Sequence, residues 1–136
     1  AGVALKAGVI EILDLLDFLR LPRAIATSSS HRAVAAHIGH AGIMPRFTAI
    51  IARGDYDNGK PHPDPYLRAA EAIGVPAFQC LALEDSHNGV RSAAAAGMMT
   101  IMVPDLLDPT DEMHVLVHSV QESLHHVREL IEAAAR

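Results

Sequence analysis

Hydroxyl groups follow a short apolar run in the first quarter of the chain. The run 23–27 ends in Thr27, and the three serines 28–30 come next, directly before a helical pattern that starts at His31. Hydroxyls and free backbone N–H groups at a helix N-terminus bind anions, phosphate above all. This turn is therefore a candidate phosphate-binding segment. The alternative is that a serine here only caps the helix.

Two adjacent acidic residues, Glu84 and Asp85, follow a second apolar run at 80–83. Because side chains alternate along a strand, at least one of the two carboxylates should face the crevice beyond the strand end. Adjacent carboxylates at such a position suit a hard cation such as Mg²⁺, which prefers oxygen ligands. The pair is a candidate magnesium site, and a helix-capping cluster is the alternative.

A lysine lies between a flexible and a rigid residue in the middle of the chain. Lys60 follows Gly59 and precedes Pro61, so its ammonium group could be held in place rather than move freely. A solvated loop lysine is the alternative. Residues 54–60 also match the first seven positions of a phosphate-binding P-loop, but Pro61 stands where that motif needs the magnesium-binding serine or threonine. We therefore exclude a P-loop.

The elements that would position these groups alternate between helices and strands. Hydrophobic spacing and capping residues predict helices over 9–19, 31–41, 64–73, 88–96 and 121–134, and strands over 23–27, 47–52, 81–83 and 100–103, with a possible edge strand over 114–117. Asp64 is the predicted N-cap of the third helix, with Pro65 in its first turn and Gly74 at its end.

This alternation predicts an α/β fold with a parallel sheet flanked by helices and joined by right-handed crossovers. In such sheets, functional groups gather beyond the carboxyl ends of the strands. Thr27, Glu84 and Asp85 all fall at that edge. The sequence therefore predicts one site built from segments that lie far apart along the chain.

Composition narrows the class of protein and its location. The 136 residues are 50% hydrophobic and 20% charged with a formal net charge of −5, which predicts one soluble domain over 1–136 and no nucleic-acid or anionic-membrane partner. The single Cys80 lies in an apolar run, which indicates a buried thiol in a reducing compartment. No basic segment followed by a long apolar stretch marks the N-terminus, and no apolar run approaches the roughly 20 residues of a membrane span. We expect a cytoplasmic protein.

Four segments, in their order and spacing, resemble the haloacid dehalogenase (HAD) superfamily, specifically its β-phosphoglucomutase-like phosphatases. These segments are residues 24–29, 59–67, 83–90 and 93–98. The resemblance covers nearly the whole chain from Leu5, since residues 5–9 are similar to the segment that re-enters the core from the family's cap domain. It implies a Rossmann-like core.

The resemblance implies a role for each candidate residue. The Thr27 hydroxyl and the Ser28 backbone would hold the transferred phosphoryl group, and Lys60 would bridge that group and the nucleophile. Asp85 would ligate Mg²⁺ directly, with Glu84 as a second or water-mediated ligand. In the family, a carboxylate attacks phosphorus to give an aspartyl-phosphate that water then hydrolyses, and the implied substrate is a small phosphorylated metabolite.

One part of the family pattern is missing from this chain. No apolar strand is followed by Asp-x-Asp and a hydroxyl residue, the motif that supplies the nucleophile, and Asp14 and Asp17 lie three residues apart inside a helical pattern. The family's cap domain is also missing. In the family, the strand of that motif lies between the strands that end at Thr27 and Glu84. We therefore expect these two strands not to pair directly, with a missing N-terminal segment or another chain completing the sheet.

These observations lead to a main hypothesis and two alternatives. The intact protein is expected to be a magnesium-dependent phosphatase or phosphomutase, and this chain, which has no nucleophile of its own, is expected to be inactive alone. The first alternative is a non-catalytic phosphate- or metal-binding module or an inactive fragment. The second is a receiver-like domain that is phosphorylated on Asp85.

Overall fold

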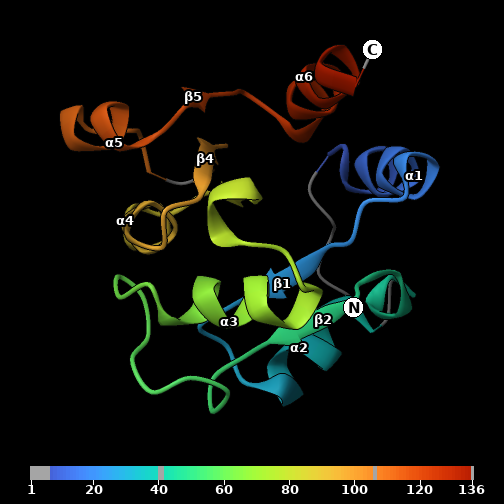
Figure 1. Ribbon diagram of the computed structural model, residues 1–136, viewed down its shortest axis with the longest axis vertical. Coiled ribbons are helices and arrows are strands. Elements are labelled where there is room, and N and C mark those ends of the chain that lie inside the picture. The colour runs from blue at the N-terminus through green and yellow to red at the C-terminus, as the bar shows by residue number, and fades with distance from the viewer. Residues whose placement is uncertain (1–6, 40–41, 106, 136) are drawn as a thin grey trace.

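Helices alternate with short strands along the chain (Figure 1). The structure is a computed structural model that describes residues 7–39, 42–105 and 107–135. The helices are α1 (Val9–Leu19), α2 (His31–Ile38), α3 (Asp64–Ile73), α4 (His87–Ala95), α5 (Asp111–Leu116) and α6 (Leu124–Ala135). The strands are β1 (Ala24–Ala26), β2 (Ala49–Ile51), β3 (Leu81–Glu84), β4 (Met99–Met102) and β5 (Ser119–Val120). Two 3₁₀ helices complete the fold, η1 (Met44–Arg46) and η2 (Ala77–Gln79).

The strands form two separate parallel sheets. Strand β1 pairs with β2, with Ile25 opposite Ile50, and the second sheet has the order β3-β4-β5. The predicted α/β class with parallel strands is therefore confirmed. As the sequence predicts, β1 and β3 are not paired with each other within the described residues.

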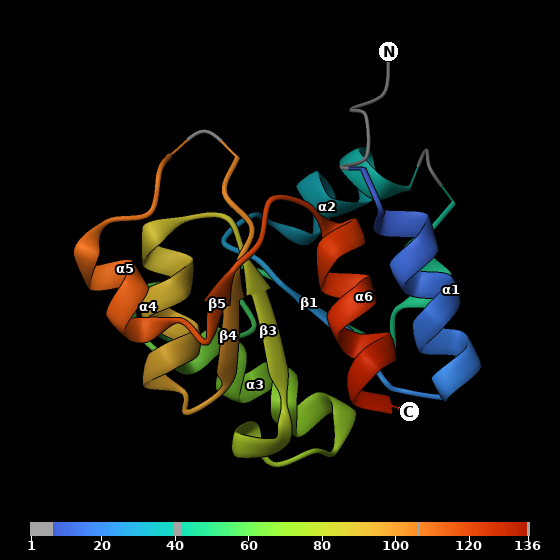
Figure 2. The ribbon, with the colours of Figure 1, turned by 90° about the horizontal axis from the view of Figure 1, so that it is seen from above.

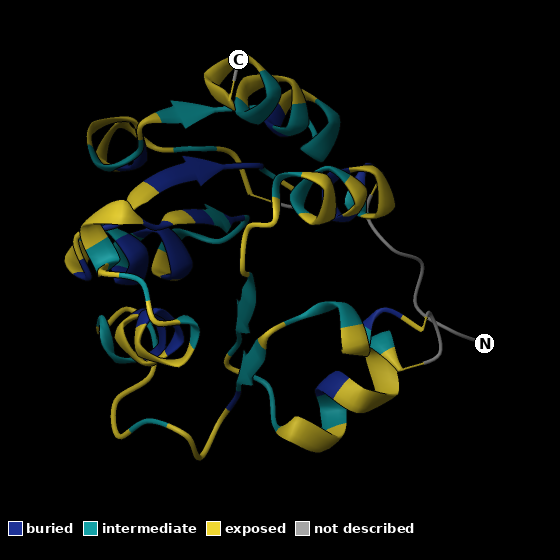
Figure 3. Cartoon of the chain, turned by 45° about the vertical axis from the view of Figure 1, so that its right-hand side comes forward, coloured by how far each residue is buried: buried dark blue, intermediate teal, exposed yellow. Residues whose placement is uncertain are grey.

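Helices cover both faces of the three-stranded sheet (Figure 2). Helices α1 and α6 lie side by side on one face, where Ile12, Ile101 and Val127 pack together. On the other face, α4 and α5 pack through Val90 and Met113 against β4. A third cluster joins α3 and α4 to the start of the sheet and is rich in alanine, as expected for a chain with only 4% aromatic residues. Figure 3 shows the buried residues gathered on the inward faces of these elements.

Two predictions about local structure are wrong. Residues 114–117 are not an edge strand, because Thr110 caps a helix there by accepting a hydrogen bond from Met113 N at 3.3 Å, and α5 runs through most of the segment. Asp64 is not the N-cap of α3 but its first residue. Its carboxylate instead accepts a hydrogen bond from Asn58 N at 3.1 Å and so ties down the preceding loop.

The remaining predictions on elements agree with the structure within a few residues. Helix α1 has the predicted bounds, and Gly74 ends α3 with a φ of 71° in the left-handed region. The predicted end of the second helix at Ala41 lies outside the described residues, as does most of the 5–9 segment. Cys80 is buried, and this burial raises the pKa of its thiol. Within the described ranges, no helix has the length and apolar character that crossing a membrane requires.

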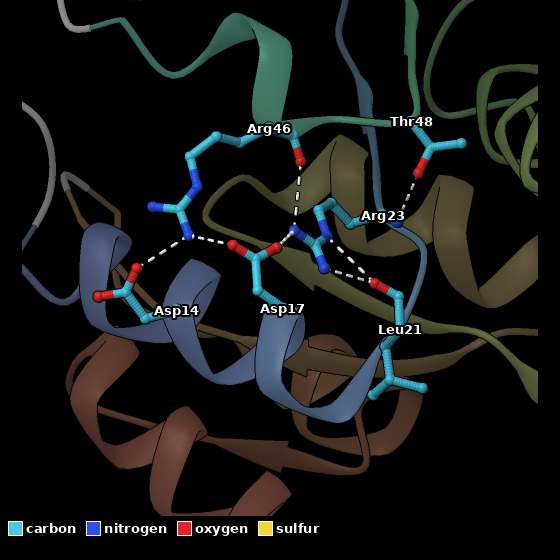
Figure 4. Close-up of polar contacts among 6 residues, drawn as sticks. All are labelled: Asp14, Asp17, Leu21, Arg23, Arg46 and Thr48. Carbon is cyan, nitrogen blue, oxygen red and sulfur yellow. Dashed lines mark hydrogen bonds and ion pairs between the residues drawn. The ribbon is translucent and has the colours of Figure 1, made fainter.

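A charged network fixes α1 against the start of β1 (Figure 4). The Arg46 guanidinium donates to Asp14 at 2.8 Å and to Asp17 at 2.6 Å, and Arg23 also donates to Asp17. The hydrogen bond from Arg23, followed by that from Arg46, holds the pKa of Asp17 below its ordinary value. Both aspartates are thus exposed side chains of α1 that pair with arginines near the start of β1.

Candidate active site

The turn after β1 contains both a helix cap and an exposed hydroxyl residue. Thr27 N donates to Ile51 O at 2.9 Å, so the pairing with β2 continues one residue past the strand. Ser30 is the N-cap of α2 and accepts a hydrogen bond from Ala33 N at 3.1 Å. The capping alternative therefore holds for Ser30. Ser28 is exposed at the turn and takes no part in the cap, so its predicted phosphate-binding role stays open.

Lys60 crosses from its loop to the ends of two strands that belong to different sheets. Its Nζ donates to Ala26 O at 3.0 Å, at the end of β1, and to Glu84 Oε2 at 2.5 Å, at the end of β3. The side chains of Lys60 and Glu84 are only 12% and 7% exposed. Lys60 is therefore not a solvated loop lysine, and it links the two sheets at the edge where the sequence placed the site.

The loop that carries Lys60 is held by several hydrogen bonds. Ser92, which is fully buried in α4, donates its hydroxyl to His62 O at 2.5 Å. His62 N in turn donates to Gly59 O at 3.0 Å, which closes a tight turn around Lys60. These contacts fix the loop backbone on both sides of the lysine.

Every oxygen of the Glu84 carboxylate faces a hydrogen-bond donor. In addition to Lys60, Oε2 accepts from the Tyr66 hydroxyl at 2.5 Å, while Oε1 accepts from Asp85 N at 3.3 Å and from Ser86 Oγ at 3.4 Å. Burial, followed by the negative charge of Glu84, raises the pKa of Tyr66, so its hydroxyl remains a donor. Glu84 is thus engaged as a buried ion-pair partner, and direct ligation of a metal by Glu84 would compete with these donors.

The other acidic residue of the pair, Asp85, lies just beyond the end of the strand. It is half-buried and follows the last residue of β3. Among the residues that the structure describes, no three His, Cys, Asp or Glu side chains converge as a metal site. Mg²⁺ accepts such a sparse protein ligand set, because it keeps several waters and takes phosphate oxygens. The donors present therefore fit part of a magnesium site.

An open hollow lies next to Ser28 and Lys60, beyond the ends of β1 and β2. Its volume is about 300 Å³, and it is lined by Ser28, Arg53, Gly54, Tyr56, Asp57, Gly59 and Lys60. The Tyr56 hydroxyl donates to Thr27 O at 2.8 Å and so holds the turn after β1 in place. The hollow is large enough for a phosphate group with a small organic part.

Sequence reasoning missed two tyrosines in this region, Tyr56 and Tyr66. Tyr66 reads as an ordinary apolar residue of a helical pattern, and nothing in its spacing indicates that its hydroxyl reaches Glu84. The only available signal was its position six residues after Lys60 on the same segment. The structure brings Lys60 and Glu84 together at the end of β1, with Thr27 and Ser28 directly after that strand and Asp85 directly after Glu84.

The parallel α/β fold, with its polar groups at the carboxyl ends of the strands, defines a Rossmann-like domain. The family model of haloacid dehalogenase-like hydrolases matches residues 2–97. This match covers more than half of the chain, which therefore belongs to the haloacid dehalogenase-like hydrolases.

Curated relatives and solved structures agree with this assignment. The chain is 38% identical over 114 residues to protein CbbY of Cupriavidus necator, covering 81% of this chain and 44% of that protein. It is 34% identical over 99 residues to fructose-1-phosphate phosphatase YqaB of Escherichia coli, covering 69% of this chain and 53% of that protein. The crystal structure of CbbY from Rhodobacter sphaeroides in complex with phosphate superposes with a TM-score of 0.78 at 28% identity, over 90% of this chain and 55% of that one. The chain thus spans about half the length of the curated relatives it matches.

Proposed function

We propose that the whole protein is a magnesium-dependent phosphatase of a small phosphorylated metabolite and that this chain supplies the phosphoryl- and metal-binding side of its active site. The observation that carries the proposal is the buried Lys60, held by Glu84 and Ala26 O between the ends of β1 and β3. Relatives that include a fructose-1-phosphate phosphatase support the reaction class. The net charge of −5 supports a small-molecule substrate rather than nucleic acid or a membrane, and the buried Cys80 supports a cytoplasmic location.

Lys60 would act as a fixed cation for the phosphoryl group. An ammonium group has three N–H donors, and two of them are used by Ala26 O and Glu84. The third has no acceptor within the described part of the chain and could donate to a phosphoryl oxygen. Thr27 Oγ1 and Ser28 N would supply further donors from the adjoining turn. Fixed donors of this kind stabilise charge that develops on a transferring phosphoryl group.

Asp85 would hold the magnesium ion, with Glu84 as a second or water-mediated ligand. When bound, Mg²⁺ would neutralise charge on the phosphoryl oxygens. The hydrogen bonds to Glu84 favour the water-mediated arrangement, because both of its oxygens already have donors. Glu84 would then serve mainly to hold Lys60 in place.

The nucleophile would come from outside this chain. The sequence contains no Asp-x-Asp with a following hydroxyl residue after an apolar strand, and β1 and β3 each have one edge without a strand partner in the described fold. A strand from a preceding segment or from another chain would complete the sheet and bring the attacking carboxylate to the position beside Lys60. A non-catalytic phosphate-binding module remains the second candidate, because the same missing motif favours it.

Hydrolysis of p-nitrophenyl phosphate separates the two candidates. The whole protein, with the strand that carries the nucleophile in place, should turn over this substrate only with Mg²⁺, and Asp85→Ala should abolish turnover. The 136-residue chain alone should show none. Turnover by this chain alone would contradict an external nucleophile, and a whole protein without Mg²⁺-dependent turnover would favour the non-catalytic module.

A further inference from the structure

Tyr66 is a buried side chain of α3 whose hydroxyl lies in the candidate active site. The residue is 7% exposed, and its ring packs in the apolar cluster with Ala70 and Ala82. Its hydroxyl donates to Glu84 Oε2 at 2.5 Å, and the Lys60 ammonium lies 5.2 Å from the centre of its ring. One side chain therefore contacts both members of the buried ion pair.

We propose that Tyr66 is a positioning residue that locks the Glu84 carboxylate and thereby fixes the Lys60 ammonium for phosphate binding. This inference rests on the proposed function and adds a residue to it. Glu84 Oε2 accepts from Lys60 and Tyr66 at the same time, so the tyrosine fixes the rotation of the carboxylate about its last bond. Without that second donor, Lys60 would be the only described donor to Oε2, and the longer contacts of Asp85 N at 3.3 Å and Ser86 Oγ at 3.4 Å, both to Oε1, would be left to orient the carboxylate.

The hydroxyl is separable from the packing role of the ring. A phenylalanine would fill the same space against Ala70 and Ala82 and would keep the aromatic face beneath Lys60. The hydroxyl is buried with the residue, and burying a polar group costs free energy unless it is hydrogen-bonded. Its only described partner is Glu84, so its effect on the structure passes through that carboxylate.

The ring contributes a second, weaker contact to the lysine. A cation within about 6 Å of an aromatic centroid is attracted to the ring face, and this attraction grows when the pair is shielded from water. Lys60 is 12% exposed, so its ammonium meets this condition. Tyr66→Phe therefore tests the hydroxyl alone, and Tyr66→Leu tests hydroxyl and ring together.

The chain offers a clean way to follow Lys60, since Lys6 and Lys60 are its only lysines. With lysine labelled with ¹³C at Cε, the 136-residue chain should give two lysine signals, which Lys60→Arg assigns. The order parameter of Lys60 Cε reports how tightly the ammonium is held, on the picosecond-to-nanosecond timescale. Titration with inorganic phosphate reports binding separately. The matched control is Thr100→Val, which removes a buried hydroxyl that donates to Met98 O at 3.1 Å, at the opposite end of the sheet.

We expect Tyr66→Phe to lower the Lys60 order parameter and to weaken phosphate binding about tenfold, the scale for loss of a hydrogen bond to a charged group. Tyr66→Leu should have a larger effect, and Thr100→Val should change neither readout. Equal Lys60 order and phosphate affinity in Tyr66→Phe and the unaltered chain would overturn the inference, as would an equal loss in Thr100→Val.

Two further results keep this inference distinct from the proposed function. If the unaltered chain binds no phosphate but Tyr66→Phe still loosens Lys60, the positioning role stands and the proposed function fails. If Tyr66→Phe does not fold, hydrogen exchange in the unaltered chain tests the inference instead. Its Tyr66 hydroxyl proton should exchange slowly with water, and fast exchange would overturn the inference.

Discussion

Replacing Gly89 by alanine should loosen the centre of the candidate site. Gly89 lies in the first turn of α4, and a methyl group built there would overlap the carboxyl carbon and both oxygens of Glu84, far inside the 3.4 Å at which ordinary contact begins. The carboxylate is buried and cannot retreat without stretching its 2.5 Å bonds to Lys60 and Tyr66. The substitution must therefore either displace α4 or break the ion pair between Lys60 and Glu84.

The expected cost follows from these contacts. Overpacking a filled interior costs about 1–3 kcal/mol, and weakening a hydrogen bond to a charged group costs about 1.5–3 kcal/mol. Glycine to alanine in a helix ordinarily gains about 0.5–1 kcal/mol, which opposes both terms. We expect Gly89→Ala to lower the free energy of unfolding by about 3 kcal/mol, whereas replacing a glycine by alanine inside a helix ordinarily raises it.

Urea denaturation measures this change, with Gly59→Ala as the matched control. A methyl group at Gly59 meets no described heavy atom within 4 Å, and the φ of Gly59 is not in the left-handed region, so the control should be neutral or slightly stabilised. Gly89→Ala should lower the urea midpoint with an unchanged slope. Equal midpoints for Gly89→Ala and Gly59→Ala would refute the close packing of α4 on Glu84.

Three more outcomes follow from contacts outside the ion pair. Arg23 and then Arg46 hold the pKa of Asp17 below its ordinary 3.8, so the Asp17 carboxylate stabilises the fold above that pH, and this stabilisation is lost as the pH falls through the lowered folded-state pKa. Arg46→Gln should raise the Asp17 pKa measured by NMR and make the free energy of unfolding depend less on pH in acid. An unchanged pKa would contradict the network. Ser92→Ala should cost about 1 kcal/mol in urea unfolding and weaken phosphate binding, since it frees the loop that carries the site lysine; unchanged stability and binding would show that this anchor is dispensable. Cys80 should react with a thiol reagent only after denaturant is added, because burial raises its pKa, and fast reaction in buffer would contradict its buried position.

Local patterns along the chain were sufficient for most of the fold. Helix α1 has the predicted bounds because its apolar residues repeat at helical spacing and Pro22 follows it closely. The strands before Thr27 and Asp85 were predictable from short apolar runs followed by polar turns. Their separation into two sheets followed from the family resemblance and not from any local pattern, since strand order is a property of the whole sheet.

The errors and omissions have physical causes. At 114–117, a run of only four residues could not distinguish strand from helix, and the deciding cap at Thr110 lay outside it. Asp64 has the composition of an N-cap, but its carboxylate is drawn to Asn58 in the preceding loop. The Lys60 to Glu84 ion pair spans 24 residues, so the site residues were predicted one by one while their contact was not.

The central claim is that this chain carries a magnesium-dependent phosphate site built on Thr27, Lys60 and Asp85. Calorimetric titration of inorganic phosphate into the 136-residue chain, with and without Mg²⁺, tests it most directly. We predict that Mg²⁺ tightens phosphate binding, that Asp85→Asn removes this effect of Mg²⁺, and that Lys60→Met weakens binding under both conditions. Phosphate binding that does not respond to Mg²⁺, or that is unchanged in both variants, would contradict the account.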